Sequence, residues 1–329
     1  PASAARTRGR RVGALLGALL AGGLLLGGWL SQQRTPGLDP SPAAERDPLD
    51  QPFRLLNDEG LDPAELLARA RERLATDPLD LAARVAEAAA LQGLDDYDAA
   101  AALAESVLEE RPEHLGALQV LAGCSYRLGR HPQATAACER ALGVDPRSEF
   151  ALVYLSLLAS ARGEPAAGVD FAERALAAHA QSGGAYGARG VARMNLGQVA
   201  DALADFDASL KTGEVQDIRF NHACALMHLG REAEAIEDLE RVQGPLRDSV
   251  EWRATRIQCL LELDPQQAER EARALVAERS ERPDATYLLA DALRRQGEPE
   301  AKSWFQRVIE LDSASQWGRA AARKLSGAR

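Results

Sequence analysis

A helix–turn–helix pattern of 33 or 34 residues recurs along most of this chain. Its clearest copy spans residues 115–148, where apolar residues three and four positions apart mark two amphipathic helices. Gly129 separates the helices, since glycine adopts the positive φ that ends a helix, and Pro146 closes the second one. Glycine recurs at the equivalent turn at Gly93, Gly163, Gly197, Gly230 and Gly297. One hairpin cannot bury its own apolar face, so the units are expected to stack.

Small residues recur where the two helices of a unit must approach closely. They are Ala122, Ser156, Gly190, Ala223 and Ala290 in first helices, and Ala134, Ala202 and Ala235 in second helices. A repeat of about 34 residues with these columns resembles the tetratricopeptide repeat (TPR) family. The resemblance implies an all-α fold, a right-handed α-solenoid of helix–turn–helix repeats. The abundance of alanine and the lack of strand-like runs agree with an all-α fold.

We divide the chain into five segments. These are a basic tail (1–11), a transmembrane helix (12–30), a proline-rich linker (31–61), a repeat domain (62–312) and a C-terminal capping helix (313–329). The linker is expected to be extended, and the repeat domain to hold a half repeat followed by about seven repeats. The capping helix offers Trp317, Ala320, Ala321 and Leu325 to cover the last repeat. The sixth repeat departs most from the pattern, because Leu263 replaces the turn glycine and Arg256 occupies a small-residue column.

Residues 12–30 carry no charge, and as a helix they would span about 28 Å, close to the bilayer core. A cleaved signal peptide is the alternative, but its apolar core would be shorter, and the residues from Gly28 onward offer no small-x-small cleavage site. The stretch therefore favours an uncleaved anchor. Arginines concentrate before it, which predicts a cytoplasmic N-terminus and an extracytoplasmic, periplasmic repeat domain.

The net charge of the chain is −10, although residues 1–34 hold five arginines and no acids. The remainder is therefore more acidic than the whole. An acidic repeat domain argues against nucleic-acid binding, which needs a basic face. Lysine occurs only at Lys211, Lys302 and Lys324, and this arginine-rich, alanine-rich composition is typical of a GC-rich bacterial genome.

No metal-binding, phosphate-binding or dinucleotide-binding motif occurs in the sequence. His222 and His228 are six residues apart and would lie on different faces of one helix, so no metal site is expected. The carboxylates fall in turns and on outward-facing positions of second helices, where we expect them to be solvated. We therefore expect no enzyme activity, no cofactor and no small-molecule substrate.

Cys124, Cys138, Cys224 and Cys259 fall on helix faces that otherwise hold small apolar residues. Buried free thiols are one interpretation. A disulfide between Cys124 and Cys138, in the two helices of one hairpin, is the other, because an oxidising compartment would permit it. The sequence alone leaves both open, since it does not determine the distance between the two residues.

The TPR resemblance also implies a binding surface, because first helices line the concave groove of such stacks. Mapped by column, the groove would present Tyr126, Phe150, Val153, Leu157, Val191, Met194, Phe220, Met227, His228, Arg253, Leu260 and Tyr287. Exposed apolar patches often mark partner sites. The alternative is that several of these residues only pack between adjacent hairpins. Asn221 lacks the basic neighbour that a clamp for a C-terminal carboxylate would need.

These observations predict a membrane-anchored scaffold that binds a protein partner through the groove, as an accessory subunit of a membrane complex. A chaperone-like holder of unfolded or exported chains is the alternative. A fixed partner in stoichiometric amounts favours the scaffold, and a mixed population of bound chains favours the holder.

Overall fold

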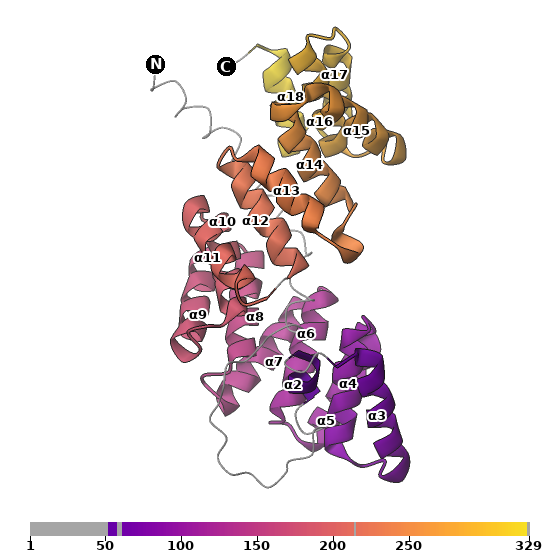
Figure 1. The fold of residues 1–329 in the computed structure, drawn as a ribbon, viewed down its shortest axis with the longest axis vertical. Helices are drawn as coiled ribbons and strands as arrows, with labels where there is room; N and C mark the ends of the chain where they lie inside the picture. Colours follow the sequence, from indigo (N-terminus) through magenta and orange to yellow (C-terminus); the bar gives the residue numbers. More distant parts are fainter. Residues whose placement is uncertain (1–51, 58–60, 214, 328–329) are drawn as a thin grey trace. The chain divides into compact units, whose positions relative to one another are not determined.

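The computed structural model describes residues 52–57, 61–213 and 215–327, and all regular structure within these ranges is helical (Figure 1). The elements are α2 (Pro52–Asn57), α3 (Pro63–Thr76), α4 (Leu81–Gly93), α5 (Tyr97–Glu110), α6 (Leu115–Arg127), α7 (His131–Val144), α8 (Glu149–Ala161), α9 (Pro165–Ala178), α10 (Gly183–Asn195), α11 (Val199–Leu210), α12 (Gln216–His228), α13 (Glu232–Arg241), the 3-10 turn η2 (Gly244–Leu246), α14 (Val250–Leu263), α15 (Pro265–Glu278), α16 (Pro283–Gln296), α17 (Ala301–Asp312) and α18 (Gln316–Leu325).

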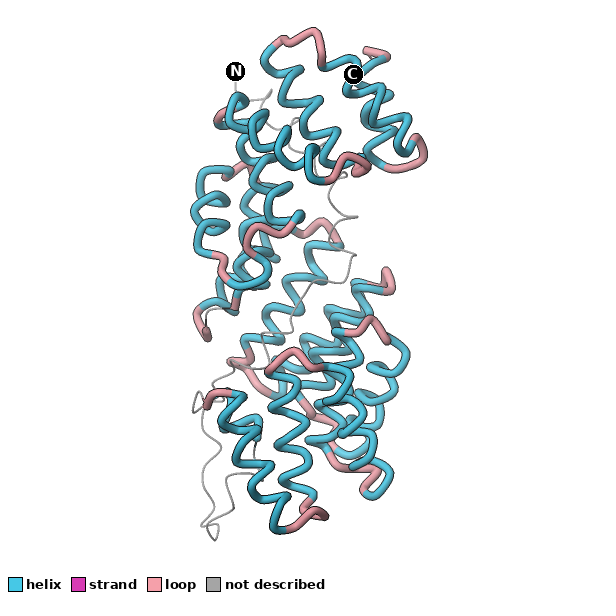
Figure 2. The backbone as a smooth tube through the Cα atoms, turned by 90° about the vertical axis from the view of Figure 1, so that its right-hand side faces the viewer, coloured by secondary structure: helices cyan, strands magenta, loops and turns pink. Residues whose placement is uncertain are grey.

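From α4 onward the helices alternate as the first and second helices of hairpins, with α3 before the first hairpin and α18 after the last. Figure 2 shows the described backbone as helices joined by short loops. First helices pack on the first helices of neighbouring repeats, as α4 does on α6, α6 on α8, α8 on α10, and α14 on α16. Each apolar helix face is therefore covered partly by its own hairpin and partly by the next. This arrangement confirms the predicted all-α repeat array.

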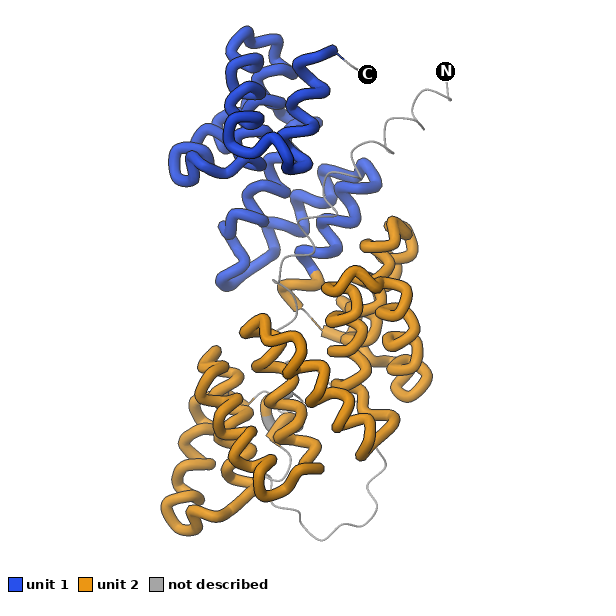
Figure 3. The backbone as a smooth tube through the Cα atoms, turned by 180° about the vertical axis from the view of Figure 1, so that it is seen from behind, with its two compact units in different colours: residues 1–19, 219–329 blue, residues 20–218 orange. Residues whose placement is uncertain are grey.

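The chain forms two compact units, and the boundary between them falls inside α12, between Ile218 and Arg219 (Figure 3). We refer to the described residues up to Ile218 as the N-terminal unit and to those from Arg219 onward as the C-terminal unit. The core of the N-terminal unit includes the fully buried side chains of Leu118, Tyr154 and Phe206. Ile257, Leu275 and Leu288 belong to the core of the C-terminal unit.

The hairpin turns follow the predicted glycines, with one exception. Gly129, Gly163, Gly197, Gly230 and Gly297 adopt φ values of 69°, 81°, 75°, 75° and 79°. The match to Gly93 was wrong, because Gly93 is the last residue of α4 and the positive φ of that turn falls at Asp95, with 63°. Gly93 is small for another reason: a Cβ atom there would lie 2.9 Å from Cγ of Pro63.

The sixth hairpin turns without a glycine because one aspartate serves both helices. Asp264 follows the last residue of α14 with a φ of −148°, so no left-handed residue is needed. Its carboxylate accepts hydrogen bonds from the backbone N–H groups of Gln266 and Gln267, at 3.1 and 3.0 Å, and thereby caps α15. Arg256, in the small-residue column of this hairpin, forms an ion pair with Glu271 of α15.

The small-residue columns mark the closest approaches between helices. A Cβ atom at Gly190 on α10 would lie 2.5 Å from the ring of Phe206, which is fully buried on α11. A Cβ atom at Gly168 on α9 would lie 2.8 Å from the backbone oxygen of Ser156 on α8. Neither neighbour can retreat without disturbing the core, so these positions have no room for a side chain.

The two ends of the described array differ in part from the prediction. The segment expected to be an extended linker contains α2, whose Leu56 is buried and which packs against α3 and α4. At the other end, Trp317, Ala320 and Ala321 of α18 are buried as expected, and the rings of Tyr287 and Trp317 are 5.2 Å apart. Leu325 remains 37% exposed, so its expected role in covering the last repeat was wrong.

The predicted anchor at residues 12–30, the basic tail and most of the linker lie outside the described residues. Within the described ranges, every helix is too short or too polar to cross a bilayer.

Replacing Gly190 with alanine tests the close approach between α10 and α11. Since the new methyl group would overlap the buried ring of Phe206, we expect the free energy of unfolding to fall by about 1–3 kcal/mol. Gly143→Ala is the matched control, because Gly143 also lies in a helix but its Cβ would meet nothing within 4 Å. This control is expected to gain up to about 1 kcal/mol from helix propensity. Urea denaturation followed by circular dichroism measures both changes, and equal effects would contradict the packing described.

Candidate protein-interaction site

The twelve side chains predicted to line a groove all lie on first helices, but many are not available to a partner. Seven are buried, namely Val153, Leu157, Val191, Met194, Phe220, Leu260 and Tyr287. Five are half-buried, namely Tyr126, Phe150, Met227, His228 and Arg253. The buried set agrees with the alternative that residues in these columns pack between hairpins. The half-buried set still reaches the surface.

In the N-terminal unit, the two half-buried residues are aromatic. The ring of Tyr126 stacks on His131, with 5.9 Å between ring centroids, and lies 5.6 Å from the ring of buried Tyr154. Burial and the nearby charge of Asp217 raise the pKa of Tyr126 to about 12, so its hydroxyl stays protonated at neutral pH. Phe150 lies in the first turn of α8. Rigid aromatic residues of this kind are the usual anchors of protein interfaces.

In the C-terminal unit, the half-buried residues are more varied. Met227 and His228 are the last two residues of α12, and burial lowers the pKa of His228, which favours a neutral ring. Arg253, in the first turn of α14, donates a hydrogen bond of 2.6 Å to Glu278 on α15. Met227, a neutral His228 and an arginine already paired with Glu278 suit the side chains of a partner protein better than they suit a polyanion.

Asn221 on α12 is a buried amide without a hydrogen-bond partner. Only 2% of the residue is exposed, and neither its Nδ2 nor its Oδ1 atom is bonded within the described structure. An unsatisfied buried amide costs about 1–3 kcal/mol, so native proteins rarely keep one without a reason.

Ion pairs, two of them on buried aspartates and the third on a half-buried glutamate, hold together the two helices of three successive hairpins, and the sequence prediction missed them. Asp205, Asp238 and Glu271 occupy the same position, eight residues after the turn residue, in second helices. Each pairs with basic side chains of the preceding first helix. Asp205 binds Arg189 and Arg193 at 2.7 and 2.8 Å. The hydrogen bond with Asp205 raises the pKa of the Arg189 guanidinium above its ordinary value, so Arg189 stays charged.

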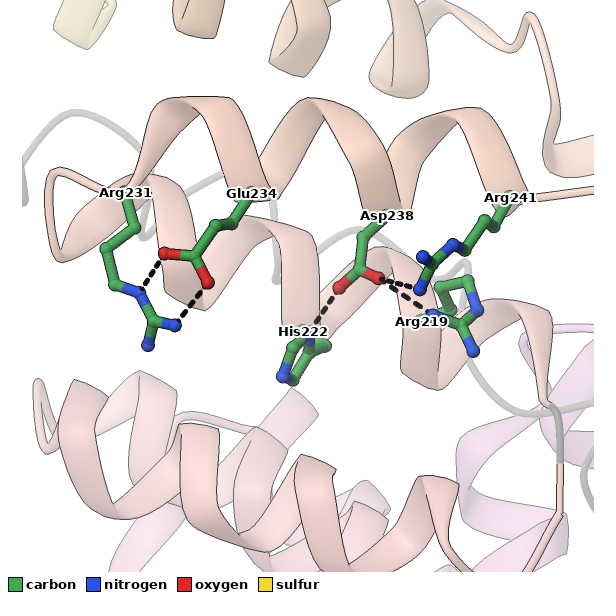
Figure 4. Close-up of polar contacts among 6 residues, drawn as sticks. All are labelled: Arg219, His222, Arg231, Glu234, Asp238 and Arg241. Carbon is green, nitrogen blue, oxygen red and sulfur yellow. Dashed lines mark hydrogen bonds and ion pairs between the residues drawn. The ribbon is translucent and has the colours of Figure 1, made fainter.

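Asp238 is the centre of the second of these clusters (Figure 4). It reaches from α13 toward α12, where His222 contacts one carboxylate oxygen and Arg219 donates a 2.8 Å hydrogen bond to the other. Arg241 lies 3.8 Å from the same oxygen as Arg219. Burial raises the pKa of Asp238, but the hydrogen bond and charge of His222, together with Arg219, outweigh it, and the pKa is lowered.

The expectation that second-helix carboxylates are solvated surface was therefore wrong for two residues. Asp205 and Asp238 are only 3% and 6% exposed. Asp284 and Asp291 on the first helix α16 are also buried, and both are paired with arginine. A search of the sequence for acidic residues at a fixed distance after each turn would have found Asp205, Asp238 and Glu271, which all lie eight residues after the turn residue.

No group of three or more histidine, cysteine, aspartate or glutamate side chains within the described ranges is arranged to hold a metal ion. The four cysteines are free and buried, as the buried-thiol interpretation expects, and the alternative bridge between Cys124 and Cys138 is not formed. Burial raises the pKa of Cys124, Cys138 and Cys224 to about 12, so these thiols are unreactive at neutral pH.

Comparison with known proteins places this architecture in a family. Tetratricopeptide repeat models match residues 91–160, 188–249 and 263–316, which together exceed half of the 329 residues. The chain therefore belongs to the tetratricopeptide repeat family, whose members are protein–protein interaction scaffolds and are typically non-catalytic.

Individual relatives are distant. Protein FlbA of Caulobacter vibrioides is 29% identical over 139 residues, which cover 41% of this chain but only 23% of FlbA. The crystal structure of the APC/C hetero-tetramer Cut9–Hcn1 matches with a TM-score of 0.63 and 12% identity, over 80% of this chain and 52% of that one. A structure of pilF from Pseudomonas aeruginosa matches with a TM-score of 0.52 and 16% identity, over 65% of this chain and 99% of that one. At these identities the structures share the fold alone.

Removing the charge of Asp238 tests the buried ion pairs. Asp238→Asn leaves Arg219 and His222 without their carboxylate, so we expect the free energy of unfolding to fall by about 1–3 kcal/mol at neutral pH. Because the pKa of Asp238 is lowered on folding, its contribution is complete above the ordinary value of 3.8 and is lost as the pH falls through the lower folded value. The difference between wild type and variant is thus expected to narrow below about pH 4.

Glu234→Gln is the matched control, because Glu234 lies on the same helix and pairs with Arg231 on the exposed surface. We expect no measurable change in stability from it. Thermal denaturation between pH 3 and pH 7 measures the stability of the wild-type, D238N and E234Q proteins. A D238N protein as stable as E234Q at pH 7 would show that the buried pair contributes nothing.

Proposed function

We propose that this chain is a membrane-anchored scaffold that holds a segment of a partner protein against its first helices. The observation that carries the proposal is the set of half-buried side chains on first helices, mainly aromatic and apolar, which reach the surface where the rest of their columns is buried. Protein partners are what this family binds.

The anchor and the location remain part of the proposal. The support for them is the uncharged stretch at residues 12–30 and the arginines that precede it, which favour a cytoplasmic N-terminus and a repeat domain outside the cytoplasm. A single anchor followed by a scaffold domain fits an accessory subunit of a membrane complex. A holder of unfolded exported chains would use the same surface without a fixed partner.

A pair of phenylalanine variants tests which helices bind. Phe150 on α8 and Phe171 on α9 belong to the same hairpin and are both half-buried. We expect Phe150→Ala to reduce the amount of co-purifying partner at least about tenfold, as loss of an aromatic anchor does, and Phe171→Ala to leave it unchanged. The measurement is affinity purification of the full chain from detergent extracts, with bound proteins quantified by mass spectrometry.

Three outcomes of that purification are informative. One partner in stoichiometric amounts supports the scaffold, whereas a mixed population of chains supports the holder. Loss of the partner only in the F171A protein would place binding on second helices and contradict the proposal.

Removing residues 1–30 tests the anchor. We expect the full chain to sediment with membranes and to resist extraction by carbonate, because an apolar helix of this length inserts stably. The shortened chain, which retains every described residue, is expected in the supernatant. A full-length chain extracted by carbonate, or one shown by N-terminal sequencing to be trimmed after residue 30, would contradict an uncleaved anchor.

A further inference from the structure

Basic side chains gather where two neighbouring helices end together in the C-terminal unit. Arg294 and Arg295 lie in the last turn of α16, and Arg323 and Lys324 lie in the last turn of α18. The two helices pack against each other and, being separated by the antiparallel helix α17, run in the same direction. Their C-terminal ends therefore lie side by side.

The packing of aromatic rings sets the register of this pair. Tyr287 on α16 and Trp317 on α18 are in contact, with 5.2 Å between ring centroids. Arg294 follows Tyr287 by seven residues and Lys324 follows Trp317 by seven residues. Seven residues are about two helical turns, so the two basic residues come to the same level of parallel helices. The four basic residues form one group, which we call the terminal basic cluster.

The terminal basic cluster is not neutralised by its surroundings. Asp291 lies 2.6 Å from Arg294 and 3.1 Å from Arg295, and Glu262 lies 2.6 Å from Arg295. Neither Arg323 nor Lys324 forms an ion pair with any described residue. Four cations therefore face two carboxylates, in a chain whose net charge is −10.

The neighbouring positive charges affect the pKa of Lys324 within the cluster. Burial lowers the pKa of Lys324, and the charges of Arg294 and Arg295 lower it further against the opposing effect of Asp291. A basic residue in the last turn of a helix interacts favourably with the helix dipole. Two such helix ends side by side, however, bring like charges together, and this repulsion would be relieved by a bound anion.

We propose that the terminal basic cluster binds an acidic segment of the partner protein, a short run of aspartate or glutamate residues, which contacts Arg294, Arg323 and Lys324. This inference rests on the scaffold function proposed above and adds a charge requirement to it. Charge complementarity selects the occupant. An excess of two positive charges at one pair of helix ends matches a few carboxylates, whereas a nucleic acid requires a basic groove that follows its backbone.

The test uses the full chain in detergent and a fluorescein-labelled peptide of ten residues that contains six glutamates. Anisotropy titrations compare wild type with the double variant Arg323→Gln, Lys324→Gln. We expect the variant to bind about fivefold more weakly, because two exposed attractions are lost, and we expect the wild-type affinity to fall as salt is added. Lys302→Gln with Arg307→Gln is the matched control, since it removes two exposed cations from α17 and is expected to leave the affinity unchanged.

Four results would overturn the proposal: no binding of the glutamate peptide by wild type, equal binding of a glutamine analogue, equal binding by the two double variants, or tighter binding of a ten-nucleotide single-stranded DNA. Purification of the natural partner separates this proposal from the scaffold function. A partner that co-purifies equally with wild type and with the R323Q/K324Q protein refutes the acidic contact and leaves the scaffold intact. A wild-type chain that retains no partner refutes the scaffold itself.

Discussion

Close approach of helices at small residues is the contact on which this array depends. Where Gly190 faces the ring of Phe206, the absence of a side chain lets α10 and α11 meet and seals the apolar interior of the hairpin. Small residues recur at the equivalent positions of most repeats, and each hairpin then stacks on its neighbour. Stability is built from these short-range contacts, because a first helix packs on its own hairpin partner, on the second helix of the preceding hairpin and on the adjacent first helices.

The ion pairs between the helices of three hairpins modify this scheme in the middle of the chain. In the hairpins α10–α11, α12–α13 and α14–α15, a carboxylate at one fixed position binds arginine or histidine of the preceding helix. An ion pair is a weaker source of stability than an apolar contact, because desolvation offsets much of its attraction. It is more specific, however, because an unpaired partner is costly, and it therefore favours one pairing of helices within each of these hairpins.

Much of this fold follows from periodicity alone, while side-chain pairing does not. Gly129 and Trp317 behave as the sequence indicates, since a turn glycine and a capping aromatic depend on local spacing. The turn at Asp95 was missed because the glycine nearest the expected position, Gly93, lies two residues earlier and was matched to the turn in its place. Burial of Asp205 was missed because it depends on how far an arginine reaches across a hairpin. The residues of the predicted groove lie on first helices, but their exposure differs between neighbours such as Leu157 and Phe150.

Hydrogen exchange of the G190A protein, compared with wild type by mass spectrometry, tests the central claim most directly. If the array is a series of hairpins held by their nearest neighbours, amide protection falls in α10 and α11 and in the adjacent helices α8 and α9. Protection in α15, α16 and α17, several hairpins away, stays at the wild-type level. An equal loss of protection in every described helix would contradict the account, because it would show that the chain opens as one cooperative body.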